Sequence, residues 1–143
     1  MTTRAQLSAS AERSGGHTDL MLAALEGRTE TVKTLLKRRV DINAKDDAGR
    51  TALMFAVTNL QTGSVDALLA HGADVNVRAN DGGTALILAA SAGDSEIVRA
   101  LLSKGADVSG KFTETGKTAL MLAKERGYSE IVRLLQEAGA KQK

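Results

Sequence analysis

The chain repeats one block four times, and this repetition constrains its fold more than any other feature of the sequence. The third copy is the clearest: it opens with Gly82-Gly83-Thr84-Ala85-Leu86 and closes with Gly105-Ala106-Asp107-Val108. One threonine marks each copy, at successive intervals of 33, 33 and 34 residues: Thr18, Thr51, Thr84 and Thr118. A fixed period of this length is typical of proteins built from stacked repeats.

Each threonine predicts the start of a helix, because its hydroxyl can accept hydrogen bonds from the free N–H groups of a first helical turn. Apolar residues then follow at helical spacing. An alanine stands five residues after every threonine: Ala23, Ala56, Ala89 and Ala123. A side chain this small lets neighbouring helices approach closely, so we expect this position at the contacts between repeats.

A second helix and an extended finger complete each block. Glycines that can end a helix in the left-handed conformation mark these turns: Gly27, Gly93 and Gly127 before the second helix, and Gly72, Gly105 and Gly139 after it. Leu60 and Arg39 replace glycine in two copies. An aspartate that is expected to accept a backbone N–H opens each finger: Asp41, Asp74 and Asp107. One such unit cannot bury its apolar faces alone, so the units are expected to stack.

The segments 47–56 (Asp-Ala-Gly-Arg-Thr-Ala-Leu-Met-Phe-Ala) and 70–76 (Ala-His-Gly-Ala-Asp-Val-Asn) resemble the ankyrin repeat. The resemblance covers residues 16–143, in repeats of about 16–45, 46–78, 79–112 and 113–143. It implies an all-α solenoid of four stacked helix-turn-helix units with β-turn fingers, and a concave surface used for protein recognition. The polar residues 1–15 are expected to form a leader that is disordered or partly helical.

The sequence departs from the family where many members have Thr-Pro-Leu-His at the helix start. The histidine position holds Met21, Met54, Ile87 and Met121, and the chain has no proline. We therefore expect the histidine hydrogen bonds between repeats to be missing, and the methionines to form core contacts in their place. Gln136 stands where the second and third copies have leucine, which favours a solvent-facing C-terminal cap. Thr31 and Thr34 give the first copy a similar polar character.

Composition and spacing argue against several classes of function. A net charge of +2 is too small to indicate a nucleic acid or an anionic membrane as partner. The absence of cysteine excludes thiol chemistry and fits the cytoplasm. His17 and His71 occupy different repeat positions and do not form a helical metal pair. Asp46 and Asp47 are adjacent carboxylates, but their place in a finger favours a solvated charge pair over acid–base catalysis.

Candidate binding residues come from the positions that vary between copies. The resemblance implies that recognition uses finger tips and the exposed side of each first helix. These positions hold Lys45, Asp47, Arg50, Thr58, Asn59, Arg78, Asn80, Asp81, Ser91, Phe112, Glu114, Lys117, Glu125 and Arg126. Variation at these positions is expected of an adapted surface and also of an unconstrained one.

Phe112 is the only aromatic residue in a finger, and that finger is one residue longer than the others. One interpretation makes Phe112 an exposed contact for a partner, with Arg78 beside it. The other makes it a structural plug that folds back onto the last repeat.

We expect a non-enzymatic protein–protein interaction module that binds through its concave face, acts as a monomer in the cytoplasm, and needs no cofactor or metal. Four basic residues suggest a partner with some acidic surface: Arg50, Arg78, Lys117 and Arg126. The alternative is a regulatory or scaffolding piece of a larger protein whose catalytic activity lies elsewhere.

Overall fold

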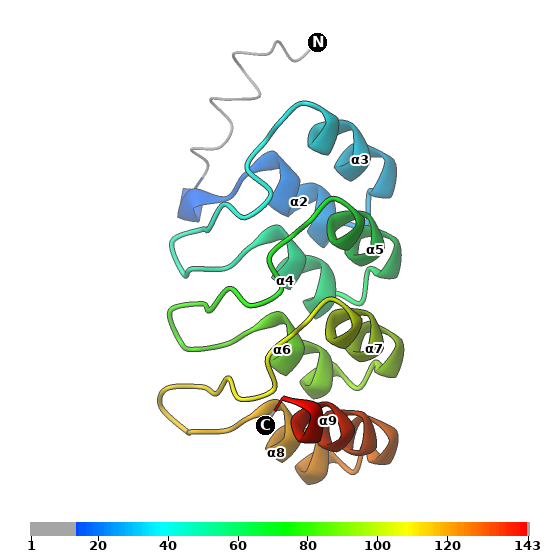
Figure 1. Ribbon diagram of the computed structural model, residues 1–143. Coiled ribbons are helices and arrows are strands. Elements are labelled where there is room, and N and C mark those ends of the chain that lie inside the picture. Colours follow the sequence, from blue (N-terminus) through cyan, green and yellow to red (C-terminus); the bar gives the residue numbers. More distant parts are fainter. Residues whose placement is uncertain (1–13, 143) are drawn as a thin grey trace.

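The computed structural model describes residues 14–142, and within them the chain forms four helix pairs stacked in one direction (Figure 1). The inner row of helices is α2 (Asp19–Leu25), α4 (Ala52–Thr58), α6 (Ala85–Ala92) and α8 (Ala119–Arg126). The outer row is α3 (Thr29–Lys37), α5 (Thr62–Ala70), α7 (Ser95–Ser103) and α9 (Ser129–Lys141). A short 3-10 helix, η2 (Ser14–Gly16), precedes α2. This architecture confirms the predicted all-α solenoid.

Three fingers project from the inner row, on the side away from the outer helices (Figure 1). We call them finger 1 (residues 38–51), finger 2 (residues 71–84) and finger 3 (residues 104–118). No β-strand occurs among residues 14–142, and finger 3 holds one isolated antiparallel bridge between Lys111 and Thr118.

The four repeated threonines cap the four inner helices, as predicted. Each hydroxyl accepts the backbone N–H three residues ahead, at 3.1 Å for Met21, 3.4 Å for Met54, 3.3 Å for Ile87 and 3.2 Å for Met121. This bond satisfies one of the N–H groups that a helix start leaves without a partner, so each copy restarts the helix at the same place.

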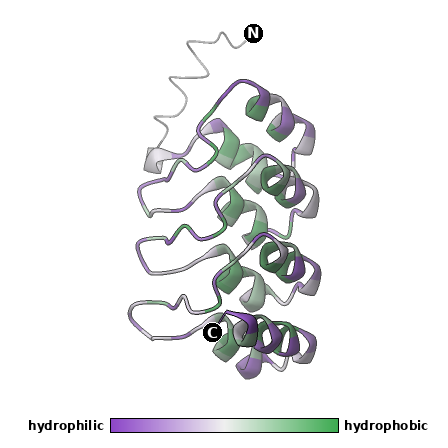
Figure 2. Ribbon diagram, in the orientation of Figure 1, coloured by the Kyte–Doolittle hydropathy of each residue, from purple (hydrophilic) through white to green (hydrophobic). Residues whose placement is uncertain are grey.

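The apolar core runs through the whole stack between the two rows of helices (Figure 2). The repeated alanines are all buried in it, which confirms their predicted place. Their lack of a longer side chain lets successive inner helices pack closely, and the larger side chains of the outer helices, such as Val98 and Leu101, fill the space behind them.

Backbone bonds tie each finger to the chain before it. The Asp47 N–H donates to Gly15 O at 2.8 Å, Asn80 N–H to Ala48 O at 2.9 Å, and Thr113 N–H to Asp81 O at 2.9 Å. The Gly15 carbonyl therefore accepts from finger 1 the same bond that fingers 2 and 3 each donate to the finger before them. Residues 1–13 of the predicted leader (1–15) lie outside the described residues.

The aspartates that open the fingers accept turn N–H groups, as predicted. Asp41, Asp74 and Asp107 each accept the backbone N–H two residues ahead, at 3.0, 2.9 and 2.9 Å. Arg39 and Leu60, which replace glycine, have left-handed backbones with φ of 60° and 55°.

Two expectations about the fourth repeat are wrong. Met121 is 50% exposed, whereas Met21 and Met54 are buried in the predicted core position. The reason is that no further helix pair in the described chain covers that side of α8. Gly139 does not end a helix, because α9 continues to Lys141 and no finger follows it among the described residues.

The polar character of the fourth repeat extends to a position that sequence comparison missed. Gln136 is exposed, and so is Lys124, which takes the place of the buried Ala24, Val57 and Ala90. A lysine at this position opposes the packing of another repeat, because its charge would have to be buried.

Candidate functional site: the finger–helix surface

We call the surface formed by the three fingers and the exposed side of the inner helices the finger–helix surface. Every predicted binding residue lies on one of these elements. Finger positions hold Lys45, Asp47, Arg50, Arg78, Asn80, Asp81, Phe112, Glu114 and Lys117. The C-terminal ends of inner helices, or the residue just after them, hold Thr58, Asn59, Ser91, Glu125 and Arg126.

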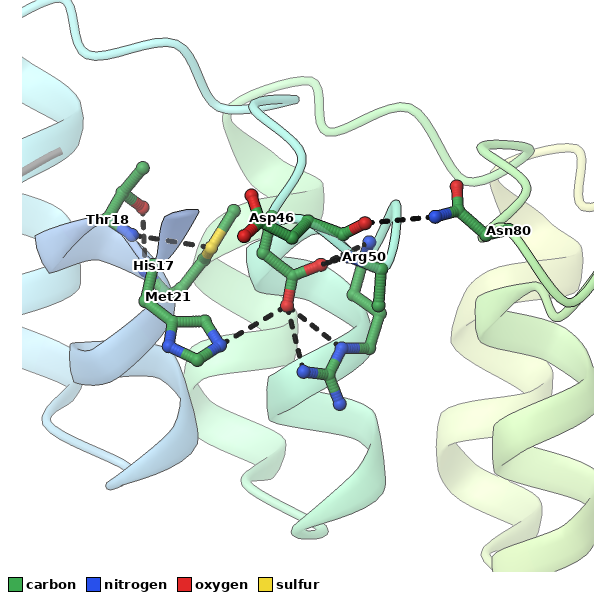
Figure 3. A network of polar contacts seen from close by, with 8 residues as sticks. His17, Thr18, Met21, Asp46, Arg50 and Asn80 are labelled. Atoms are coloured by element: carbon green, nitrogen blue, oxygen red, sulfur yellow. Dashed lines mark hydrogen bonds and ion pairs between the residues drawn. The ribbon is translucent and has the colours of Figure 1, made fainter. Parts of the chain in front are cut away.

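Finger 1 is organised around the carboxylate of Asp46, a residue that is 6% exposed as a whole (Figure 3). Its Oδ1 accepts the backbone N–H groups of Ala48 at 3.0 Å and Arg50 at 2.8 Å. Its Oδ2 accepts Arg50 Nε at 2.9 Å and lies 2.9 Å from Arg50 Nη2. The expectation of a solvated pair is therefore wrong for Asp46, and only Asp47 is exposed.

These contacts set the protonation state of Asp46. Burial acts to raise its pKa, but hydrogen bonds from the Arg50 backbone and guanidinium, together with the guanidinium charge, outweigh burial and hold the pKa below its usual value. A carboxylate that is ionised and saturated with donors is a poor proton acceptor for catalysis. Asp46 is therefore a structural anchor of finger 1.

A histidine joins the first repeat to this anchor. His17 Nε2 lies 3.3 Å from Asp46 Oδ2, and the ring of His17 packs edge-on against Phe55 with centroids 5.6 Å apart. The Arg50 guanidinium lies over the same Phe55 ring, 4.8 Å from its centroid. His17 thus contacts the second repeat from a different repeat position, and the prediction that the family's histidine hydrogen bonds are missing is unaffected.

Finger 2 lacks this anchor. The positions of Asp46 and Arg50 are taken by Ala79 and Gly83, two of the smallest residues. An open hollow of about 260 Å³ lies here, between fingers 1 and 2, and its lining includes both small residues. Its other main walls are Arg50, Met54, Asn80, Asp81, Leu88 and Phe112.

Four predicted binding residues from three fingers meet at this hollow: Arg50, Asn80, Asp81 and Phe112. The structure does not bring the rest of the predicted set into it. The variable finger positions of the sequence also include Gly83, whereas sequence reasoning missed Met54, Ala79 and Leu88 as residues of this site. Aligning finger 1 with finger 2 could have found Ala79, because an ion pair in one repeat matches two small residues in the next.

Phe112 is half-buried, so the premise of a fully exposed aromatic is wrong. Its ring packs against the edge of the core and also forms one wall of the hollow. Its backbone closes finger 3, with the N–H donating to Lys117 O at 3.0 Å and the carbonyl accepting Gly116 N–H at 2.9 Å. Both sequence interpretations of Phe112 thus describe part of its surroundings.

The four cations that suggested an acidic partner all make contacts within the chain. Arg50 pairs with Asp46, and Lys117 Nζ lies 2.9 Å from Glu125 Oε1. Arg126 donates to Ser91 O at 3.0 Å, and Arg78 donates to Lys111 O at 3.4 Å. Carboxylates offset the charges of Arg50 and Lys117, whereas Arg78 and Arg126 bond to uncharged carbonyls, and the acidic partner surface stays a prediction.

Two of the predicted binding residues on the inner helices join neighbouring repeats. Asn59 Nδ2 donates to Leu25 O at 3.1 Å, and Arg126 makes the equivalent bond to Ser91 O. Both satisfy a carbonyl near the end of the preceding inner helix, so they have a structural role in the stack.

Residues 14–142 contain no cluster of three or more His, Cys, Asp or Glu side chains that could hold a metal ion. Within the same residues, no helix is long and apolar enough to cross a membrane.

Comparison with known protein families identifies the class of this fold. A family model described as "Ankyrin repeats (3 copies)" matches residues 4–79 and again residues 65–143. The chain therefore belongs to the ankyrin repeat family. Ankyrin repeats are generally protein–protein interaction modules and are typically non-catalytic. No curated protein gives a significant match to the chain.

Proposed function

We propose that the finger–helix surface is the concave face through which this chain binds a partner protein. The observation that carries the proposal is the hollow between fingers 1 and 2. Residues from three fingers and two inner helices meet there around apolar walls with a polar rim. At protein–protein interfaces, pockets of this kind receive the anchor side chains of the partner.

The bonds between fingers support the same proposal through the energetics of binding. Each finger is held by a backbone bond to the chain before it, and Asn80 Nδ2 adds a side-chain bond to Asp47 O at 2.9 Å. A surface that is already ordered loses less conformational entropy when a partner binds. In this proposal the chain acts as a monomeric scaffold in the cytoplasm and performs no chemistry itself.

Site-specific photo-crosslinking tests the proposal. A photoreactive phenylalanine analogue placed at Ala48, which is exposed at the hollow, should capture the partner in cells. The matched control places the same analogue at Asp66, which is exposed on the outer helix α5. Crosslinks to a partner from Asp66 but none from Ala48 would overturn the proposal.

A further inference from the structure

The hollow exists because finger 2 lacks the ion pair that fills finger 1. In finger 1 the Asp46 carboxylate and the Arg50 side chain occupy the base of the turn. In finger 2, Ala79 and Gly83 place no long side chain there, and the Asp81 carboxylate and the Phe112 ring approach Gly83 instead. The site is therefore a local difference between two repeats and does not follow from the repeat pattern itself.

A carboxylate and an aromatic ring flank the same point of this hollow. A Cβ atom added to Gly83 would lie 3.0 Å from Asp81 Oδ1 and 3.1 Å from Phe112 Cε1. The Asp81 side chain is held in place, because its Oδ1 accepts the Gly83 N–H at 2.8 Å. Met54 and Leu88 supply further apolar wall.

The two charged residues of the lining differ in what they still offer to a ligand. Arg50 directs Nε and Nη2 at Asp46 and lies over the Phe55 ring, so most of its charge is already compensated. Asp81 forms no ion pair with any of residues 14–142, and Arg50 is the one basic residue in the described lining. The charge that the hollow still offers to a ligand is therefore negative.

The two neighbouring fingers also carry exposed carboxylates, next to the exposed cations Lys45 and Lys111. Asp47 on finger 1 and Glu114 on finger 3 are exposed, and neither is ion-paired within the described part of the chain. A partner carrying several cations in one segment would meet a carboxylate on each of the three fingers.

We propose that the hollow binds a lysine or arginine side chain from a basic segment of the partner protein. The aliphatic stem lies along Met54, Leu88 and Phe112, and the cationic head pairs with the Asp81 carboxylate beside the Phe112 ring. Long basic side chains combine an apolar stem with a charged end in this way, and cations are attracted to aromatic rings. The inference rests on the proposed function and adds the chemistry of the partner.

The test uses small probes and nuclear magnetic resonance on the full chain. The probes are N-acetyl-lysine methylamide, its neutral counterpart N-acetyl-norleucine methylamide, and N-acetyl-glutamate methylamide. The lysine probe should shift the amide signals of Asp81, Gly83 and Phe112 in a saturable way. The norleucine probe should bind about five-fold more weakly, because it lacks the charge.

Two substitutions distinguish the contribution of the Asp81 carboxylate to probe binding from that of the rest of the hollow. Asp81→Asn removes the charge but keeps an oxygen that can accept the Gly83 N–H, so it should reduce lysine-probe binding to the level of norleucine. Asp66→Asn makes the same change on α5 and should have no effect. Added salt should weaken the lysine probe alone, since ion pairs are screened.

Three results would overturn the inference. Equal binding of lysine and norleucine would make the hollow an apolar pocket, and preferential binding of glutamate would make the ligand acidic. An absence of saturable shifts at the three amides would mean that the hollow takes no such side chain. None of these results changes the outcome expected of the crosslinking experiment. The proposal of a basic side chain in the hollow can therefore fail while the proposal of a binding face on the finger–helix surface stands.

Discussion

Asp46 and Arg50 close finger 1 through a paired contact, with Nε and Nη2 of Arg50 each 2.9 Å from Asp46 Oδ2. The carboxylate side chain is 1% exposed, whereas the arginine side chain is 46% exposed. The pair therefore joins a buried anchor to the surface that faces a partner. Finger 2 lacks this pair, and the hollow lies where small residues take its place.

Asp46→Asn should destabilise the fold by about 1–3 kcal/mol, because hydrogen bonds to a buried charged group contribute this much. The asparagine keeps one acceptor oxygen but loses the charge that pairs with Arg50. Urea unfolding at neutral pH measures the change. Asp47→Asn is the matched control, and as an exposed substitution it should stay within about 0.5 kcal/mol. Equal effects of the two substitutions would show that Asp46 is not the anchor.

The lowered pKa of Asp46 predicts a pH dependence of stability. A carboxyl whose pKa is lower in the folded state stabilises the fold above its unfolded value of 3.8, and this contribution is lost as the pH falls through the folded pKa. The free energy of unfolding should therefore fall between about pH 5 and pH 3, and less steeply in Asp46→Asn. Asp107, whose pKa is also lowered, chiefly by hydrogen bonds from Ser109, leaves part of the slope in the variant. Identical slopes in variant and parent would contradict the role of Asp46.

The threonine caps and the buried alanines could be predicted from sequence, because each depends on bonds or packing that every repeat reproduces. The burial of Asp46 could not, because the position alone does not reveal that Arg50 would turn back onto it. The exposure of Met121 depends on whether a neighbouring repeat covers it, and the hollow depends on two adjacent fingers together. Features that arise from one repeat were predictable, and features that arise from differences between neighbours were not.

Ala89→Leu should cost roughly 1–3 kcal/mol, because Ala89 is fully buried where α6 meets its neighbours and a larger side chain overpacks that contact. Thermal unfolding measures the loss. Ala92→Leu, on the exposed end of the same helix, is the control for the change in residue type and should be nearly neutral. A parent-like midpoint for Ala89→Leu would mean that the junction has free space.

Arg39→Gly should be neutral or slightly stabilising. Arg39 has a left-handed backbone, in which a non-glycine residue costs about 1 kcal/mol, and glycine removes that cost while adding chain entropy to the unfolded state. Leu60→Gly, at the other left-handed position, should behave in the same way. Chemical denaturation of both variants checks this, and a clear loss of stability would reveal a stabilising contact of the replaced side chain.

The affinity of the crosslinked partner for a chain with two substitutions at the hollow tests whether the finger–helix surface is the binding face. Phe112→Ala with Asp81→Lys removes one wall of the hollow and reverses the charge at its edge. Val132→Ala with Glu137→Lys makes the matched change on the outer helix α9, at one half-buried and one exposed residue. Binding per folded molecule should fall more than about tenfold for the first pair, as expected of a binding hot spot, and should stay near the parent value for the second. Unchanged binding by the first pair, or an equal loss in both, would contradict the assignment of the finger–helix surface as the binding face.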